Sequence, residues 1–78
     1  MSSDPSSDEW LSEERQRVGQ TIRTVRMRHN LTQEQVFLAV PMSRAHYQAI
    51  EGGSGNPSLE MLLRISRVIG VPLADLVR

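Results

Sequence analysis

Pro41 constrains the fold of this chain more than any other single residue, because it interrupts an apolar stretch that begins at Val36. Proline has no amide hydrogen to donate and pushes the preceding residue out of the helical region, so a helix in this stretch must end by about Val40. Ser43 is the next good N-cap, and it predicts a second short helix over 44–51. The sequence therefore places two short helices on either side of a tight turn.

Capping residues and periodic apolar residues define the other helices. Thr32 and Gln35 have the spacing of a capping box, which starts the helix before the proline at about Gln33. Apolar residues elsewhere recur at intervals of three, four and seven, which is typical of helices with one buried side. The predicted helices cover about residues 12–29, 33–40, 44–51, 57–69 and 72–77. Because no alternating strand pattern competes, the sequence predicts an all-α fold with five helices.

Length and composition exclude several classes of protein. The chain has 78 residues, which suits one small domain, and it has no cysteine and only two histidines. Disulfides and cysteine-rich zinc sites are therefore excluded, and neither a metal site nor a cofactor is expected. No apolar run could span a bilayer, and no signal peptide is recognisable, so we expect a cytoplasmic protein without a membrane partner. The sequence pairs no nucleophile with a base, so we expect neither an enzyme nor a small-molecule ligand.

The net charge of zero conceals a division along the chain. Residues 1–14 contain five acidic residues and no cation, whereas residues 15–78 contain all nine arginines and four acidic residues, a net charge of +5. Residues 1–11 are therefore expected to form a flexible acidic tail before a folded domain over 12–78. The basic domain points toward a polyanionic partner. The tail could be a solvated leader, or it could fold over the basic part and compete with phosphate for the arginines.

The predicted helix over 44–51 has two chemically different sides. Tyr47, Ile50 and Glu51 share one side, because residues three and four apart are neighbours on a helix. The other side carries Arg44, Ala45, Gln48 and Ala49. An arginine can grip guanine, an amide can grip adenine, and small methyl groups let a helix approach a groove wall or a thymine methyl. The two short helices thus make a helix-turn-helix whose second helix is suited to the major groove of DNA.

Four segments in order resemble the Cro/CI-type helix-turn-helix family, also called the lambda repressor-like or XRE family. They are TIRTVRMRHNLTQEQV, SRAHYQAIEGG, NPSLEMLLRIS and IGVPLADLV, which together cover about Val18 to Val77. The resemblance implies sequence-specific binding to double-stranded DNA by a homodimer on palindromic half-sites. It implies base contacts from Arg44, Ala45, Gln48 and Ala49, and contacts to the DNA backbone from Gln33, Ser43, His46 and Ser54. It also implies a structural ion pair between Arg26 and Glu51.

The last residues of the sequence include candidates for a dimer interface. Val71, Pro72 and Val77 are expected to remain exposed near the last helices and to form the dimer interface. Because the sequence stops just after the last predicted helix, it resembles stand-alone bacterial or phage members of the family, such as small repressors, antitoxins and restriction-modification controllers. It could also be the DNA-binding module of a longer regulator.

Three residues depart from the family pattern. Phe37 stands where the family usually has a small alanine, Pro41 where it usually has glycine, and Tyr47 where it usually has an aliphatic residue. Proline cannot adopt the positive φ of a glycine turn, so this turn must differ in detail. We hypothesise that the bulk of the two aromatic residues requires a wider helix separation, which the altered turn permits. These departures also allow an alternative function, a protein-binding adaptor that keeps the fold without reading DNA sequence.

Overall fold

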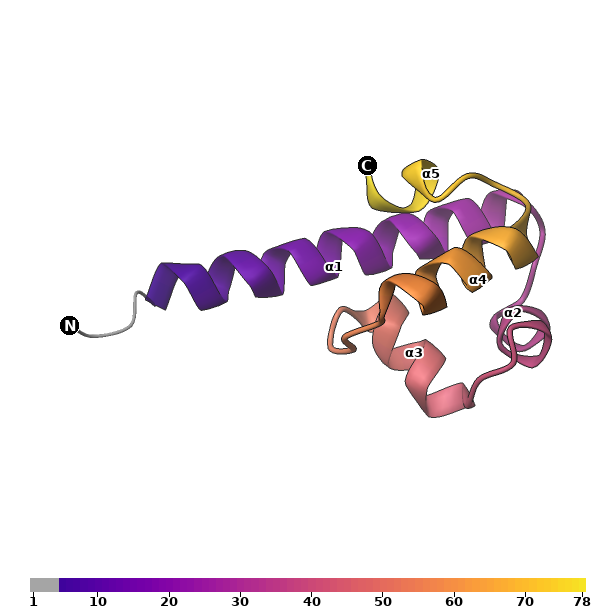
Figure 1. Cartoon of the computed structure of the whole chain (residues 1–78), viewed down its shortest axis with the longest axis horizontal. Helices are drawn as coiled ribbons and strands as arrows, with labels where there is room; N and C mark the ends of the chain where they lie inside the picture. Colours follow the sequence, from indigo (N-terminus) through magenta and orange to yellow (C-terminus); the bar gives the residue numbers. More distant parts are fainter. Residues whose placement is uncertain (1–4) are drawn as a thin grey trace.

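A computed structural model of the chain describes residues 5–78, with side chains from residue 8 onward. These residues form five helices, as the sequence predicted (Figure 1). The helices are α1 (Pro5–Arg28), α2 (Gln33–Ala39), α3 (Arg44–Gly52), α4 (Leu59–Ile69) and α5 (Ala74–Val77). Between residues 5 and 78 the structure contains no strand, so the all-α prediction is confirmed.

Helix α1 begins earlier than the sequence indicated. It starts at Pro5 rather than at Ser12, so residues 5–11, which were expected in a flexible tail, are helical instead. Extending an existing helix needs no new nucleus, and Asp8 in the first turn suits the positive end of the helix dipole. Residues 1–4 lie outside the described part of the chain, so the tail stays a prediction there.

Serine and threonine caps start the three middle helices. Thr32 and Gln35 form the predicted capping box, because the Thr32 hydroxyl accepts from the Gln35 amide at 3.0 Å and the Gln35 side chain accepts from the Thr32 amide at 2.8 Å. Ser43 and Ser58 accept from backbone amides in the same way, each at 3.1 Å. Local hydrogen bonds therefore fix where α2, α3 and α4 begin.

The core lies where the helices meet. Helix α1 packs against α3 and α5, while α2 packs against α3 and α4 (Figure 1). All five helices or their ends contribute apolar side chains that are less than a tenth exposed. These are Ile22, Val36, Phe37, Val40, Tyr47, Ile50, Ile65, Ile69 and Leu76.

Gly19 brings α1 into direct contact with the C-terminal end of α3. A Cβ atom placed on Gly19 would lie 2.6 Å from the carbonyl oxygen of Glu51, closer than real Cβ contacts allow. Only glycine fits this crossing without a shift of one helix. The position of α3 relative to α1 is therefore fixed by backbone contact.

The turn between α2 and α3 has an aromatic pair beneath it. Phe37 and Tyr47 are both buried, and their ring centroids lie 6.4 Å apart with an interplanar angle of 46°. The Val40–Pro41 peptide bond is cis, and the Met42 amide donates to the carbonyl of Phe37 at 2.8 Å. The two residues that depart from the family pattern by their bulk thus contact each other. Whether they widen the separation of α2 and α3 stays a hypothesis.

Candidate nucleic-acid interface

Helix α3 presents one side to solvent and buries the other. Tyr47, Ile50 and Glu51 are between 0% and 8% exposed, and they face the core. The predicted base-reading side lies outward, with Ala49 half-buried and the others exposed. The exposed residues of this helix include Arg44, Ala45, His46 and Gln48. The division into two sides that the helical period predicted is therefore the one observed.

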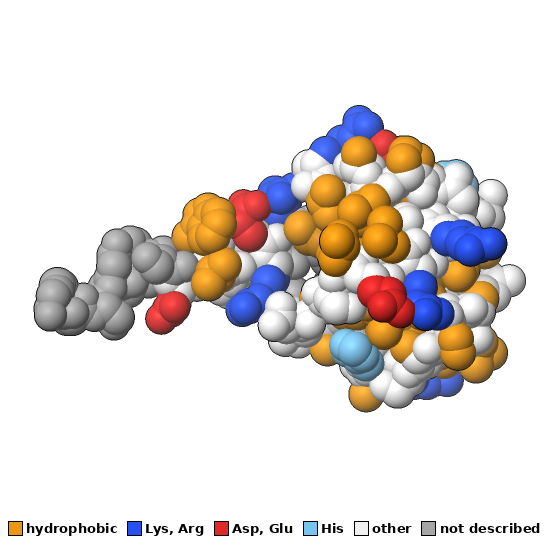
Figure 2. Space-filling view, in the orientation of Figure 1, with side chains coloured by type: hydrophobic (Ala, Val, Ile, Leu, Met, Phe, Trp, Pro, Cys, Tyr) orange, Lys and Arg blue, Asp and Glu red, His pale blue; other side chains and the backbone are white. Residues whose placement is uncertain are grey.

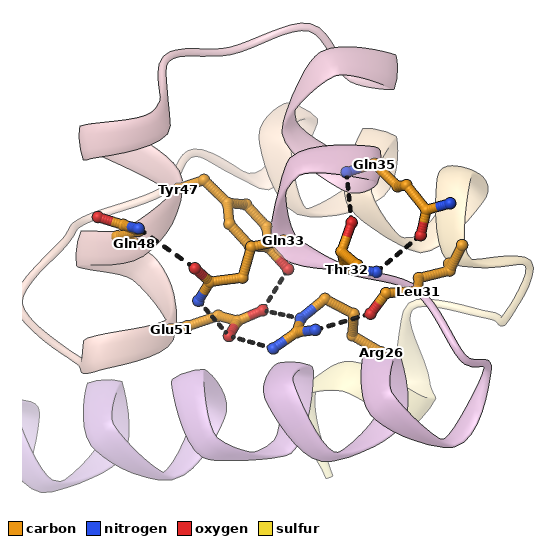
Figure 3. A network of polar contacts seen from close by, with 8 residues as sticks. All are labelled: Arg26, Leu31, Thr32, Gln33, Gln35, Tyr47, Gln48 and Glu51. Atoms are coloured by element: carbon orange, nitrogen blue, oxygen red, sulfur yellow. Dashed lines mark hydrogen bonds and ion pairs between the residues drawn. The ribbon is translucent and has the colours of Figure 1, made fainter.

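Arg26 and Glu51, the predicted ion pair, join α1 to α3 through two contacts (Figure 3). Arg26 Nε donates to Glu51 Oε2 at 2.7 Å, and Arg26 Nη2 donates to Glu51 Oε1 at 3.2 Å. The remaining Arg26 nitrogen, Nη1, donates to the carbonyl oxygen of Leu31 at 2.7 Å, just before α2. One guanidinium on α1 thus contacts both α3 and the residue that precedes the capping box of α2.

Glu51 stays ionised in spite of its burial. Burial alone would raise its pKa, but hydrogen bonds from Arg26, Tyr47 and Gln33 together outweigh burial and lower the pKa. Burial and the hydrogen bond to Glu51 raise the pKa of the Tyr47 hydroxyl, which therefore remains protonated and donates to the carboxylate. The pKa of Arg26 is raised by its hydrogen bonds to Glu51. The network therefore keeps one charge state around neutral pH.

Gln33 carries this network to the exposed side of α3 (Figure 3). Its Nε2 donates to Glu51 Oε1 at 3.0 Å, and its Oε1 accepts from Gln48 Nε2 at 3.3 Å. A carboxylate can only accept, so the orientation of the Gln33 amide is determined, and the orientation of Gln48 follows from it. Figure 3 shows the Gln48 oxygen pointing away from the network. The residue predicted to contact phosphate is thus linked to a residue predicted to read bases.

Arg44 is held by two residues of α2. Its guanidinium carbon lies 5.2 Å from the centroid of the Phe37 ring, and its Nη2 lies 3.5 Å from Glu34 Oε2. The Arg44 side chain is still 62% exposed, so the ion pair is screened by solvent and weak. Sequence reasoning missed the positioning roles of Phe37 and Glu34. The signal was the unusual bulk at Phe37, but the contact depends on how the turn folds.

The predicted backbone-contacting residues belong to α2, to α3 with its N-cap, and to the loop after α3. Gln33 is half-buried, while Ser43, His46 and Ser54 are exposed. Ser43 uses its oxygen to cap α3 at the His46 amide, which leaves the hydroxyl hydrogen for another acceptor. The Ser54 hydroxyl lies 3.5 Å from the carbonyl oxygen of Ala49, in the loop after α3. Of these residues, Gln33 contacts Gln48 directly, so it lies beside the outward side of α3.

Arg23 is a cation that sequence reasoning did not assign to the site. It is exposed on α1 and borders an open depression that is also lined by Gln33, Gln48 and Gly52. The signal was its position three residues before Arg26, which places the two arginines on neighbouring positions of the helix. Besides Arg23 and these amide groups, the depression is lined by the Arg26–Glu51 pair.

The predicted dimer residues lie away from this surface. Val71 and Val77 are half-buried and pack partly against the core, while Pro72 is exposed. Other large apolar side chains are more exposed than the two valines, including Leu38 at 65% and Leu59 at 63%. Among the described residues, no three acidic or histidine side chains come together to hold a metal ion. Nor does any helix of residues 5–78 have the length and apolar character of a membrane span.

The fold and the outward side of α3 define a helix-turn-helix protein. The sequence profile of the helix-turn-helix family matches residues 22–76, most of the chain, and the chain belongs to this family. It is 36% identical over 56 residues to the transcriptional repressor RstR of the cryptic phage CTXphi from Vibrio cholerae, a match that covers 72% of this chain and 50% of the repressor. The chain thus spans half the length of that relative.

Two further relatives and one solved structure agree with the family. The chain is 36% identical over 55 residues to the HTH-type transcriptional regulator MJ0272 of Methanocaldococcus jannaschii, covering 70% of this chain and 83% of the regulator. It is 34% identical over 59 residues to the control protein C.BamHI of Bacillus amyloliquefaciens, covering 74% and 73%. The crystal structure of the restriction-modification controller protein C.AhdI from Aeromonas hydrophila has the same fold, with a TM-score of 0.75 at 24% identity over 78% of this chain and 92% of that chain.

Proposed function

We propose that this chain is a transcriptional regulator that binds double-stranded DNA in a sequence-specific way, with α3 in the major groove. The observation that carries the proposal is the exposed side of α3. There, Arg44 and Gln48 flank the small side chain of Ala45. Small side chains let a helix enter a groove, and longer ones reach the base edges. The relatives named as a repressor and a control protein support the same function.

Base reading falls to the outward side of α3. Arg44 suits guanine, because its guanidinium can donate two parallel hydrogen bonds to one base edge. Gln48 suits adenine, since its outward oxygen can accept while its second amide hydrogen donates. The methyl groups of Ala45 and Ala49 suit a thymine methyl, although Ala49 is half-buried and reaches less far. Phe37 supports the reading of guanine by holding the Arg44 guanidinium at the edge of the helix.

Contacts to the DNA backbone fall to the residues around this side. Gln33, Ser43, His46 and Ser54 offer hydrogen-bond donors, as the family resemblance implies. Arg23 adds a positive charge beside Gln33, which favours a phosphate in the depression between them. Such contacts fix the register of a protein on the duplex without reading its sequence.

A homodimer on a palindromic site completes the proposal. Two copies related by a two-fold axis would place two α3 helices in successive major grooves. Val71, Pro72 and Val77 are proposed for the contact between the copies, because Pro72 is exposed and the two valines are partly so. The regulator would act in the compartment that holds the DNA.

Selection of binding sites from random duplex DNA tests this function. The full chain should enrich a two-fold symmetric consensus, and its affinity for that consensus should fall steeply with salt because phosphate contacts release counterions. The Arg44→Ala variant goes through the same selection for comparison. It should lose its preference at one base pair of each half-site. If no sequence is enriched and random duplexes bind as poorly as genomic DNA, the protein is an adaptor and not a sequence-reading regulator.

A further inference from the structure

The first turns of α1 form a helical arm, residues 8–15, which projects beyond the other helices (Figure 1). Trp10 is 59% exposed and Leu11 is 42% exposed, and apolar side chains gather on the projecting part of the molecule (Figure 2). Leu11 lies seven residues before Val18, which packs against the core. It therefore continues the core-facing side of α1 past the elements that cover that side.

The apolar side of the arm borders a cleft. Leu11 and Val18 line it from α1, and Ile50, Pro57 and Leu62 line it from the elements across. The cleft has a volume of about 250 Å³, is mostly apolar and opens to solvent. Large apolar side chains at the mouth of an apolar cleft mark a surface that another molecule covers.

The charges on the arm indicate which kind of molecule would cover this surface. Asp8, Leu11 and Arg15 are spaced three and four residues apart, so they share one side of the helix. Glu14 Oε1 lies 2.8 Å from Arg17 Nη2, so the carboxylate of Glu14 pairs with Arg17 and not with Arg15. Along the shared side the order is negative, apolar and positive. A second copy running in the opposite direction would therefore place its positive end opposite the negative end of the first.

We propose that the arm pairs with the arm of a second copy of this chain in antiparallel orientation. A two-fold axis between the arms places Asp8 of each copy opposite Arg15 of the other, with the two Leu11 side chains meeting at the axis. Trp10 lies at the edge of this contact. A parallel arrangement would instead place like charges side by side, which disfavours it. This contact is separate from binding to DNA.

DNA does not fit the arm. Asp8, Glu9 and Glu13 would repel phosphate, and the arm extends away from α3 (Figure 1). Two short helical segments bury a small area, so we expect weak pairing, with a dissociation constant on the order of micromolar or higher. Within this proposal, Asp8 therefore serves a contact between proteins.

Trp10 makes the pairing directly measurable, because it is the one tryptophan of the chain. Its emission is recorded over a dilution series of the full chain, alongside the molecular mass from sedimentation. We expect the emission to move to shorter wavelength and to become less quenchable by acrylamide as the mass rises. Leu11→Glu should abolish both changes in the emission. Leu38→Glu, which alters a leucine on α2 that is more exposed than Leu11, should leave both emission changes as they are in the native protein.

Charge reversal tests the antiparallel orientation. Asp8→Arg and Arg15→Asp should each weaken pairing about tenfold, because symmetry replaces two attractive pairs by two repulsive ones. The double variant, which carries both changes, should restore pairing. Position 8 of each copy is then positive and faces a negative position 15 of the other. Circular dichroism checks that the variants keep their helix content.

Several results would overturn the proposal. One is a Trp10 emission that stays constant while the mass rises, because self-association then uses another surface. Another is a protein that remains monomeric up to millimolar concentration. A double charge variant no better than the single variants would also contradict it. If the emission is already shifted at every concentration, the proposal requires Leu11→Glu to shift it back.

Discussion

The guanidinium of Arg44 lies over the ring of Phe37, with its carbon 5.2 Å from the ring centroid. Phe37 belongs to α2, and its ring also meets Tyr47 in the core. A buried aromatic residue therefore links the interior to the side chain best suited to read guanine. The bulk at Phe37, which departs from the family pattern, thus has a role in placing an exposed cation.

Replacing Arg44 by alanine should remove base preference at one position of each half-site. The loss should be about 1 to 3 kcal/mol of discrimination, because one bidentate contact disappears. Competition binding with sites changed at single base pairs measures this value. Arg67→Ala, an exposed arginine on α4, is the control and should leave the preference unchanged. Equal preference in Arg44→Ala and the native protein would exclude the proposed groove contact.

Replacing Phe37 by leucine should weaken the same discrimination without abolishing it. Leucine keeps the position apolar but offers no ring to the guanidinium, and an exposed cation–π contact is worth about 0.5 to 1 kcal/mol. The same single-base competition measures this effect. Phe37→Leu should have no further effect in an Arg44→Ala background, because the partner is then absent. Additive losses in the double variant would show that the ring acts through packing alone.

Replacing Arg23 by alanine should weaken binding to all DNA sequences alike. A phosphate contact carries no sequence information, and its loss should reduce the salt slope of binding by about one. Binding isotherms at several salt concentrations provide the slope for specific and random duplexes. Arg28→Ala on the same helix is the control, because Arg28 does not line the depression beside Gln33. An unchanged slope in Arg23→Ala would remove Arg23 from the interface.

Adding a methyl group at Gly19 should destabilise the fold. Its Cβ would lie 2.6 Å from the carbonyl oxygen of Glu51, so a helix must shift, at a cost of about 1 to 3 kcal/mol. Urea unfolding of Gly19→Ala measures this loss. Gly52→Ala is the matched control, because a Cβ there meets nothing within 4 Å, and it should be neutral or slightly stabilising. Equal stability of the two variants would contradict the close crossing of α1 and α3.

Acid should destabilise the protein through Glu51. The pKa of this carboxyl in the folded protein lies below its ordinary value of 4.5, so the unfolded chain binds more protons in the window between the two values. Its contribution is complete above pH 4.5 and is lost as the pH falls through the lowered pKa. Urea unfolding over this pH range measures the effect.

Two variants isolate the contribution of Glu51. Glu51→Gln should unfold more easily at neutral pH by about 3 kcal/mol, because Arg26 loses its buried partner, and the gap to the native protein should close in acid. Glu60→Gln alters an exposed pair with Arg64 and should change stability little at any pH. A constant gap between Glu51→Gln and the native protein across the pH range would contradict the lowered pKa.

Local signals in the sequence were sufficient for the helix boundaries near the turn. Pro41, the capping box at Thr32 and the cap at Ser43 act over a few residues, so α2 and α3 start where they were predicted to start. The start of α1 was missed, because the polar composition of residues 5–11 indicated a tail. A helix that is already nucleated can continue through such a sequence at little cost.

The contacts within the site were harder to predict, because they depend on packing between helices. The Arg26–Glu51 pair came from the family resemblance, whereas the bonds from Glu51 through Gln33 to Gln48 join positions that only the folded chain brings together. The contact of Arg44 with Phe37 depends on a turn in which Pro41 stands where the family usually has glycine. Periodicity could identify the outward side of α3 but not the residues that hold its side chains.

The backbone contact at Gly19 also has a consequence for the proposed binding of α3 to DNA. Because α1 and α3 touch without an intervening side chain, the short helix cannot tilt or slide independently of the long one. Any adjustment to an imperfect operator must then come from rotamer changes at the surface or from bending of the duplex itself. If α3 binds DNA as proposed, we expect tolerance for variant sites to track the deformability of their base steps.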